Sequence, residues 1–274
     1  LSNLASSVNQ MCEQLIAAQE AIRTETEARI FTIEQLRHAE RLATLGRLSS
    51  GVAHELGTPL NVISGRAMLI MSENLEKKGI AECSRIIIEQ TERMTKLIRQ
   101  FLDFARRRPL DKSQIDLRII IGQVLELLNP NAEKMNISLE FIKNSDISLV
   151  SIDSSQIQQL LMNLIMNGIQ AMPNGGNLEV ELRLERSYPP SQKKCEEKEY
   201  FAIDVRDKGE GISQENMNYI FEPFFTTKET GKGTGLGLSI SYGIVEEHGG
   251  WIDVESKPGQ GACFTVFLPV EVAQ

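Results

Sequence analysis

Helix-breaking residues are distributed very unevenly along this chain of 274 residues, and this constrains its fold more than any single motif. Of the 20 glycines and 9 prolines, only five glycines and two prolines precede Asp116. Because glycine and proline interrupt helices and mark turns, we expect the first part to be helical and the second to alternate helices with strands. A chain of this length suits about two domains of ~100 to 200 residues.

The first part has the pattern of long amphipathic helices. Apolar residues follow the four- and three-residue steps of a coiled-coil seam at positions 4, 8, 11, 15, 18 and 22, and a shifted stripe begins at Ile30. A second amphipathic helix is predicted from about Ile86 to Leu102, after a polar turn near residues 72–79. Two helices joined by a turn form a hairpin, whose apolar face a second copy covers most simply in a four-helix bundle. We therefore expect a homodimer.

The second part reads as a mixed sheet packed on helices. Helices are predicted near residues 117–134, 153–172 (capped by Asp153) and 238–247. Strands are predicted near residues 137–142, 148–152, 177–185 and 200–206 and in a hairpin within 251–268, with a surface loop at 187–199. The predicted fold class is thus α + α/β: a dimeric four-helix-bundle hairpin followed by an α/β sandwich with a mixed sheet.

Charge and composition exclude several classes of function. The formal net charge is −8, from 29 basic and 37 acidic residues, so bulk electrostatics disfavour nucleic acid and anionic lipid. The four cysteines show no metal-knuckle or redox spacing, which is typical of a reducing compartment. No apolar run is long enough to span a membrane. Because the chain starts with leucine and has no signal peptide, we expect a fragment of a longer protein, and the cysteine pattern favours a reducing compartment such as the cytoplasm.

Three segments of the second part suggest nucleotide chemistry. Asn163 and Asn167 lie four residues apart on a predicted helix, with both amides on one face; a polar surface stripe is the alternative. DKGEGI, residues 207–212, places an acceptor side chain and two glycines after a strand, although Asp-x-Gly is also ordinary turn chemistry. GKGTGLGLS, residues 231–239, opens a helix, where backbone amides and the helix dipole favour phosphate.

FEPFFTTK, residues 221–228, lies between the last two segments, with aromatics that can pack down a lid and a lysine that could reach a phosphate. Together these boxes give residues 153–268 a resemblance to the ATP-binding domain of sensor histidine kinases, in the family shared with gyrase B, the Hsp90 chaperones and MutL. That resemblance implies a Bergerat-type fold that binds ATP and Mg²⁺.

The resemblance also implies roles for single residues. Asn167 would hold the Mg²⁺, Asn163 would support the metal and phosphates, and Asp207 would recognise adenine. The remaining expected ATP-site residues are Gly209, Gly211, Ile212, Lys228, Gly233, Thr234, Gly235, Leu236, Gly237 and Leu238. The gyrase and chaperone branches carry a glutamate at position 163, the base that activates water. Asparagine cannot act as that base, so we expect a phosphoryl acceptor other than water.

Two further positions depart from the family pattern. Gln170 stands where many relatives have a basic residue near the phosphates, and Lys208 replaces the commoner asparagine. A basic contribution from position 170 is therefore missing.

The acceptor is expected in the first part, at His54. It lies in SSGVAHELGTPLNVI, which resembles the phosphoacceptor box of histidine kinases, with Glu55 adjacent, Thr58 one turn on, and Pro59 removing a helix hydrogen bond. Glu55 would keep the imidazole nucleophilic, and Thr58 would orient a water in an E-x-x-T phosphatase motif; a helix-bend role for Thr58 is the alternative. Of the other histidines, His38 is expected to be solvated and His248 to be structural at a helix C-terminus.

The resemblance predicts four regions: a signalling helix at 1–40, the helical hairpin at 41–109, a linker at 110–115 and the ATP-binding domain at 116–274. Residues 1–15 resemble the last helix of a HAMP module, with a bare coiled coil as the alternative, so a membrane anchor is expected upstream. The implied function is autophosphorylation of His54 and transfer to the receiver domain of a response regulator. Alternatives are an ATPase of the chaperone or DNA-repair branch and an inactive nucleotide-sensing scaffold.

Overall fold

The computed structural model describes residues 49–72, 76–105, 110–144, 149–189, 197–228 and 235–270, with Met11, Thr32 and residues 14–15, 18–26 and 28–29 near the N-terminus. The described residues of the N-terminal part are helical and exposed. Four of the six predicted seam positions, Met11, Leu15, Ala18 and Ile22, are described and are helical and exposed, whereas most of the HAMP-like segment lies outside the described residues. The chain divides into two compact units, Leu1–Arg107 and Arg108–Gln274, which are described separately.

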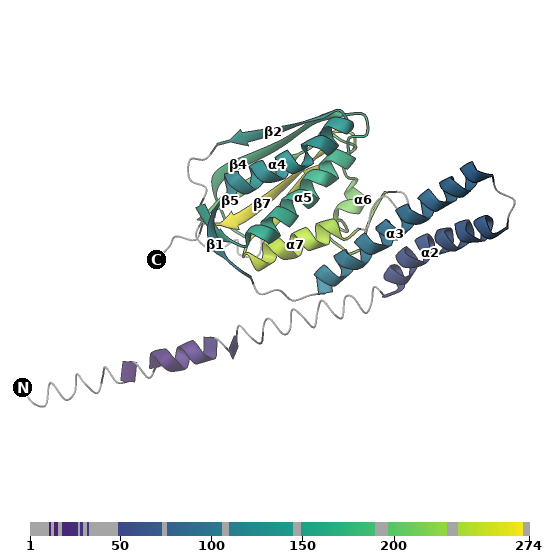
Figure 1. Ribbon diagram of the computed structural model, residues 1–274. Helices are drawn as coiled ribbons and strands as arrows, with labels where there is room; N and C mark the ends of the chain where they lie inside the picture. The colour runs from purple at the N-terminus through teal and green to yellow at the C-terminus, as the bar shows by residue number, and fades with distance from the viewer. Residues whose placement is uncertain are drawn as a thin grey trace, which may run out of the picture. The chain divides into compact units, whose positions relative to one another are not determined.

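The first unit contains a helical hairpin. Helices α2 (Ser49–Met71) and α3 (Lys77–Ala105) lie side by side, as predicted (Figure 1). The amide of Ser72 donates to the Met68 carbonyl at 3.1 Å and ends α2. Helix α3 begins at Lys77, before the end of the predicted turn, so Gly79 is a helical residue. Among the described side chains of the hairpin, Pro59, Cys83 and Leu97 are buried.

The second unit is built on a five-stranded mixed sheet. Its strands are β2 (Ile137–Lys143), β4 (Gly176–Ser187), β5 (Lys198–Arg206), β6 (Trp251–Ser256) and β7 (Ala262–Pro269). Their spatial order is β2-β4-β5-β7-β6; β2 and β4 pair in parallel, and the other neighbours are antiparallel. The predicted mixed sheet and terminal hairpin are confirmed.

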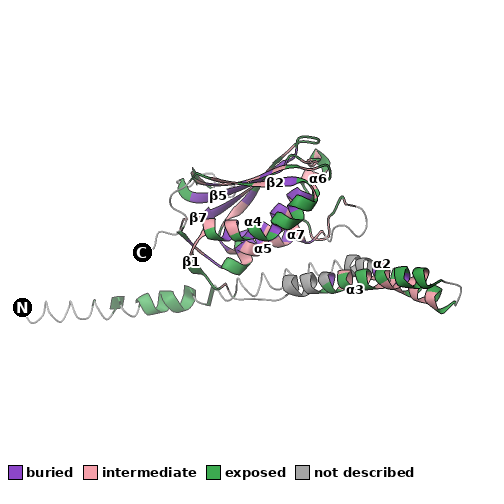
Figure 2. Cartoon of the chain, turned by 45° about the horizontal axis from the view of Figure 1, so that its top comes forward, coloured by how far each residue is buried: buried purple, intermediate pink, exposed green. Residues whose placement is uncertain are grey.

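Three helices cover one face of this sheet: α4 (Leu117–Lys134), α5 (Ser154–Gln170) and α7 (Gly237–Glu247) (Figure 1). The buried residues lie between these helices and the strands (Figure 2). Along β4, Leu178, Val180 and Leu182 alternate with half-buried polar residues, so one strand face enters the core. Fully buried core side chains include Leu117, Ile121, Ile157, Leu160, Leu161, Leu164, Ile165, Ile169 and Phe201.

Two short elements were not expected from the sequence. Strand β1 (Ser113–Asp116) pairs antiparallel with β3 (Leu149–Ile152), with Ser113 opposite Ile152. Residues 113–115, which the sequence analysis assigned to a linker, therefore belong to a two-stranded sheet of the second unit. This strand is only four residues long, and its partner lies more than thirty residues away, so local pattern could not reveal it. The other element is α6 (Gln214–Met217), which Ser213 caps by accepting from the Asn216 amide.

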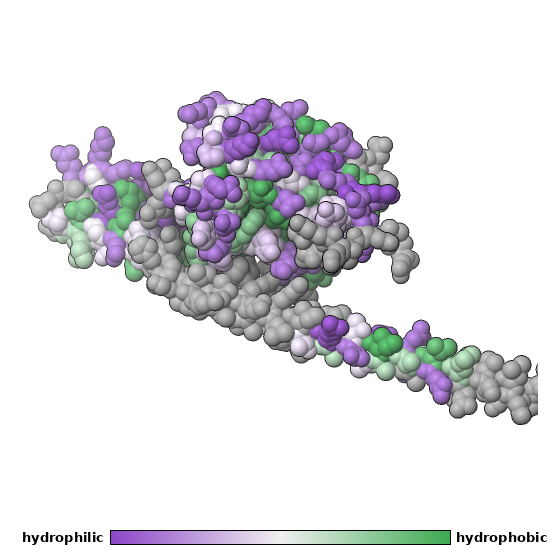
Figure 3. Space-filling view, turned by 180° about the vertical axis from the view of Figure 1, so that it is seen from behind, coloured by the Kyte–Doolittle hydropathy of each residue, from purple (hydrophilic) through white to green (hydrophobic). Residues whose placement is uncertain are grey.

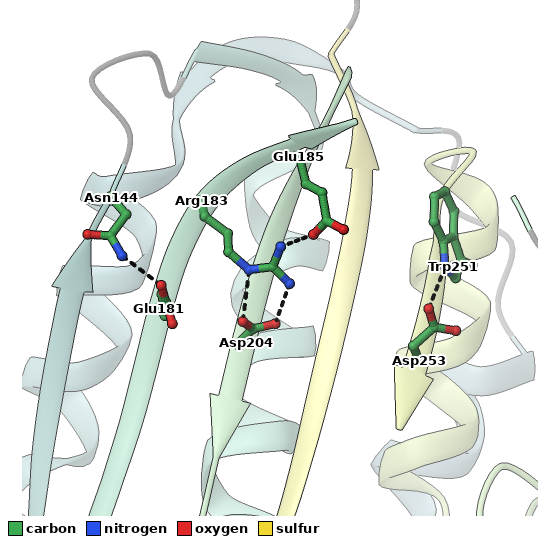
Figure 4. Close-up of polar contacts among 7 residues, drawn as sticks. All are labelled: Asn144, Glu181, Arg183, Glu185, Asp204, Trp251 and Asp253. Atoms are coloured by element: carbon green, nitrogen blue, oxygen red, sulfur yellow. Dashed lines mark hydrogen bonds and ion pairs between the residues drawn. The ribbon is translucent and has the colours of Figure 1, made fainter. Parts of the chain in front are cut away.

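The opposite face of the five-stranded sheet carries polar and aromatic side chains. Arg183 on β4 bonds Asp204 on β5, with Nε to Oδ2 at 3.0 Å, and also pairs with Glu185 (Figure 4). Trp251 stacks on Phe267 with ring centroids 4.4 Å apart. Hydrophilic side chains also dominate the surface of the second unit seen in Figure 3. These polar and aromatic side chains therefore lie on the face of the sheet that the three helices leave uncovered (Figure 1 and Figure 4).

Candidate functional site

The two asparagines lie on helix α5, whose start is fixed by its N-cap. The Asp153 carboxylate accepts from the amides of Ser155 at 3.0 Å and Gln156 at 3.2 Å. Asn163 Nδ2 donates to the Gly237 carbonyl at 3.2 Å, and Asn167 Oδ1 accepts from Lys228 Nζ at 3.5 Å. These partners come from α7 and from the segment after α6, so the predicted face of α5 contacts two of the other predicted boxes.

Lys228 is held by α5 through a second contact. Its ammonium donates to Gln170 Oε1 at 2.5 Å, three residues beyond Asn167. Lys228 is half-buried, and burial lowers the pKa of its ammonium because charge is less stable away from water. Lys228 was predicted from the sequence to reach a phosphate, whereas its bond to Gln170 was not predicted.

Asp207 follows strand β5 and is buried, with 5% of its surface exposed. Its Oδ1 accepts from the Gly209 amide at 2.8 Å and from the Ala262 amide at 3.3 Å. Burial raises the pKa of its carboxyl group, and the two backbone bonds oppose that shift. Both bonds end on Oδ1, so Oδ2 is the atom suited to accept from a ligand such as an exocyclic amine.

The glycines of DKGEGI are required by the close packing of the protein's own backbone. A Cβ at Gly209 would lie 2.4 Å from the Ala171 carbonyl oxygen, and one at Gly211, where φ is +70°, would lie 2.1 Å from that of Lys257. The close approach is therefore to the protein's own backbone. Nearby, the Ile212 amide donates to Ser256 Oγ at 2.8 Å and ties this loop to the end of β6. Lys208 forms an ion pair with Glu179 at 3.8 Å and is largely exposed.

The phenylalanine box, FEPFF at residues 221–225, anchors the start of α7. Phe224 has φ of +66°, and its amide donates to the Gly235 carbonyl at 2.9 Å. Gly235 also has a positive φ of +64°, and its missing Cβ would lie 2.3 Å from the Phe224 carbonyl carbon. Phe221 packs on Tyr242 of α7 at 5.3 Å between ring centroids. Positive φ in a phenylalanine is strained, so the surrounding contacts hold this turn in place.

The second glycine-rich segment, GTGLGL at residues 233–238, is described from Gly235 onward. Leu236 is buried with 1% exposed, so its side chain belongs to the core. Gly237 is the first residue of α7, and its carbonyl accepts from both Asn163 and Ser241, the latter at 2.9 Å. Leu238 is partly buried against the core. Gly233 and Thr234 lie outside the described residues.

Residues 54, 55 and 58 lie on one continuous helix, α2, which also contains Pro59. Proline has no amide hydrogen, so the Glu55 carbonyl lacks its usual helical donor. Thr58 is half-buried and Pro59 is buried. The side chains of His54 and Glu55 lie outside the described part of the chain, as does His38.

His248 is a buried structural residue, as the sequence analysis favoured. Its Nδ1 contacts the Ile244 carbonyl at 2.8 Å, and its Nε2 accepts from the Asp153 amide at 3.0 Å. The ring is therefore neutral with its proton on Nδ1, and burial lowers its pKa. It joins the C-terminus of α7 to the N-cap of α5. Helix α7 is thus held to α5 at both of its ends, here at the N-cap of α5 and at the Asn163–Gly237 contact near the middle of α5.

The donor set suits a nucleotide that brings its own metal ion. Asn167 offers an amide oxygen, a hard donor that already faces a cation in the form of the Lys228 ammonium. Among the described residues, no cluster of three or more histidine, cysteine or acidic side chains could hold a metal by itself. Mg²⁺ binds in this way, through few protein oxygens together with substrate phosphates.

Comparison with known proteins assigns both units. Residues 152–272 match the family of histidine kinase-, DNA gyrase B-, and HSP90-like ATPases, and residues 44–110 match the His Kinase A (phospho-acceptor) domain. The chain belongs to the sensor histidine kinases. Sensor histidine kinase ZraS of Escherichia coli K12 is 32% identical over 242 residues, which cover 88% of this chain and 49% of ZraS. Sporulation kinase E of Bacillus subtilis 168 is 31% identical over 237 residues, covering 86% of this chain and 30% of that kinase.

Solved structures of histidine kinases share the fold. Histidine kinase ThkA, solved in complex with response regulator protein TrrA, is 29% identical with a TM-score of 0.69, over 86% of this chain and 65% of that chain. Full-length ShkA in complex with AMPPNP is 25% identical with a TM-score of 0.58, over 83% of this chain and 46% of that chain. This chain spans half or less of the length of ZraS and sporulation kinase E. The predicted family is confirmed, and so is the predicted helical hairpin followed by an α/β domain with a mixed sheet.

Proposed function

We propose that this chain is a histidine kinase transmitter that phosphorylates itself on His54 with ATP as donor and passes the phosphoryl group to an aspartate of a response regulator. The observation that carries the proposal is the combination of a phosphoacceptor hairpin and an ATPase-like domain in one chain. ThkA was solved with a response regulator and ShkA with AMPPNP, which supports the same partner and the same nucleotide here.

In the proposed reaction, a ring nitrogen of neutral His54 forms a bond to the γ-phosphorus as the bond from phosphorus to the ADP oxygen breaks. The other ring nitrogen keeps its proton and would donate a hydrogen bond to the adjacent Glu55 carboxylate. Asp207 would bind the adenine amine through Oδ2, and Lys228 would contact the phosphates. Bound Mg²⁺, with Asn167 as its protein ligand, would neutralise charge on the transferring group.

Asn163 favours transfer to histidine over hydrolysis. Its amide nitrogen donates to the Gly237 carbonyl, and a carboxamide has no basic site with which to deprotonate water. An ATPase of the chaperone or DNA-repair branch would need such a base at this position. The described geometry therefore supports a kinase over that alternative.

A homodimer is part of the proposal. Only a few described side chains of the hairpin are buried, whereas many large apolar ones are exposed: Leu60, Val62, Met68, Leu69, Met71, Ile80, Ile88 and Ile98. Apolar surface of this extent, spread along two helices, favours burial against a second hairpin. Among the described helices, none is long and apolar enough to cross a membrane, and the anchor expected upstream stays a prediction.

Labelling with γ-labelled ATP and Mg²⁺ tests the kinase reaction. Wild-type protein should retain acid-labile, alkali-stable phosphate, whereas His54→Gln should retain none and still bind nucleotide. His38→Gln is the matched control and should label like wild type. Retained label in His54→Gln would contradict the assignment, and continuous phosphate release without label would favour the ATPase alternative. Neither label nor release would favour the inactive scaffold.

Thr58 supports a second activity, removal of phosphate from the regulator. It lies four residues after His54 and three after Glu55 on α2, as the E-x-x-T motif requires. Thr58→Ala should leave His54 labelling within about twofold of wild type and slow regulator dephosphorylation by at least about tenfold, the scale of a lost water-positioning group. Equal dephosphorylation rates in the two proteins would remove Thr58 from this role.

A further inference from the structure

Helix α5 carries both asparagines of the candidate site but no charged residue. All 17 residues from Ser154 to Gln170 are neutral at pH 7. The helix therefore presents amide groups to the site, and an anionic ligand there requires a cation from elsewhere. The structure places one beside it, because Lys228 reaches α5 from a segment 58 residues further along the chain than Gln170.

The position of Lys228 is constrained at two levels. Four residues earlier, the Phe224 amide bonds the Gly235 carbonyl, which fixes the backbone at the end of the phenylalanine box. The Lys228 amide then donates to Thr226 Oγ1 at 3.2 Å. At its far end, the ammonium donates to Gln170 Oε1 at 2.5 Å and approaches Asn167 Oδ1 at 3.5 Å. The shorter of these two contacts is the one to Gln170.

The two contacts differ in what a ligand would do to them. The Asn167 oxygen is the proposed metal ligand, so Lys228 must leave it when a metal ion binds there. The Gln170 oxygen has no such competitor and can keep one of the three ammonium donors while the other two face a phosphate. A lysine side chain that is already held loses less rotational freedom on binding.

We propose that Gln170 is a positioning residue that holds the Lys228 ammonium over the phosphate site, so that Lys228 supplies the positive charge that α5 lacks. This rests on the proposed nucleotide-binding function and adds to it a role for Gln170. Gln170 acts through Lys228 and has no separate contact with the nucleotide. Replacing Gln170 should therefore weaken nucleotide binding only in a protein that still has Lys228.

A double-mutant cycle on Mg-AMPPNP affinity tests this, with the full chain and isothermal titration. Lys228→Met removes the charge and keeps the aliphatic stem, and should weaken binding about tenfold, which corresponds to about 1.4 kcal/mol. Gln170→Leu should weaken it about threefold to fivefold. The double variant should bind like Lys228→Met alone. If the two substitutions weaken the affinity independently, so that their fold-losses multiply in the double variant, the proposal is overturned.

Moving the charge provides a rescue. Gln170→Lys combined with Lys228→Met places an ammonium on α5 itself and should bind Mg-AMPPNP within about threefold of wild type. No gain over Lys228→Met would overturn the proposal. Gln158→Leu, about 18 Å nearer the start of the same helix, is the matched control and should bind like wild type. Unfolding midpoints of all variants close to that of wild type would exclude loss of folding.

A measurement without nucleotide separates this inference from the proposed function. In the nucleotide-free protein, Lys228→Met should shift the side-chain amide resonances of Gln170 in a ¹⁵N correlation spectrum and leave those of Gln158 in place. Unshifted Gln170 resonances would overturn the inference even if His54 becomes labelled. If the double-mutant cycle gives the expected affinities but wild-type protein does not become labelled on His54, only the kinase assignment is overturned.

Discussion

His248 links stability of the second unit to pH. Its neutral ring bonds the Asp153 amide and the Ile244 carbonyl, and Lys112, Asp153 and Glu247 are the charged groups that act on it. Because burial lowers its pKa below 6.5, the unfolded chain binds the proton more readily than the folded one. The stabilisation is complete above pH 6.5 and is lost as the pH falls towards the lowered folded-state pKa.

We predict that His248→Met removes this part of the pH dependence. At pH 7.5 the variant should be less stable by about 1 to 3 kcal/mol, because the buried Asp153 amide loses its acceptor. At pH 5.5 the difference should be smaller. Urea unfolding of both proteins at the two pH values measures this, and an unchanged difference would show that His248 does not titrate in this range.

At the scale of elements, the contact between Phe224 and Gly235 joins the phenylalanine box to α7. Alanine at position 235 must adopt φ near +64° and place its Cβ against the Phe224 backbone. Gly243, within α7 itself, has open space at the Cβ position. The two glycines therefore form a pair that differs in backbone conformation and in the space around the Cβ position.

We predict opposite effects of alanine at these positions. Gly235→Ala should destabilise the protein by about 1 to 3 kcal/mol and weaken nucleotide binding, since the start of α7 must shift. Gly243→Ala should stabilise it by about 0.5 to 1 kcal/mol through helix propensity. Denaturant unfolding gives both values. A neutral Gly235→Ala would mean that the turn relaxes without cost.

At the scale of the whole molecule, we predict a dimer in solution through the hairpin. Light scattering should give about twice the 30.6 kDa mass of one chain. Ile88 on α3 is 59% exposed within one chain, so Ile88→Glu should leave the monomer folded and weaken dimerisation by about tenfold or more. Lys78→Glu, already polar and near the start of α3, is the control. A dimer unaffected by Ile88→Glu would place the interface elsewhere.

The sequence by itself determined the elements whose signals are local. The apolar spacing of α5 and its Asp153 cap predicted that helix within two residues of its observed ends, and alternating apolar residues did the same for β4. It also determined the family, because the ordered boxes and the His54 segment are contiguous motifs that need no tertiary contact to be read.

Tertiary structure alone decided contacts between distant segments. Strand β1 exists because it pairs with β3, and Gly209 is required because the Ala171 carbonyl approaches it. Gln170, which looked like a missing charge in sequence, is bonded to Lys228 across 58 residues. Local spacing encodes propensity and periodicity, whereas the partner of a side chain depends on how the chain packs, and that is the physical reason the sequence could name Lys228 but not what holds it.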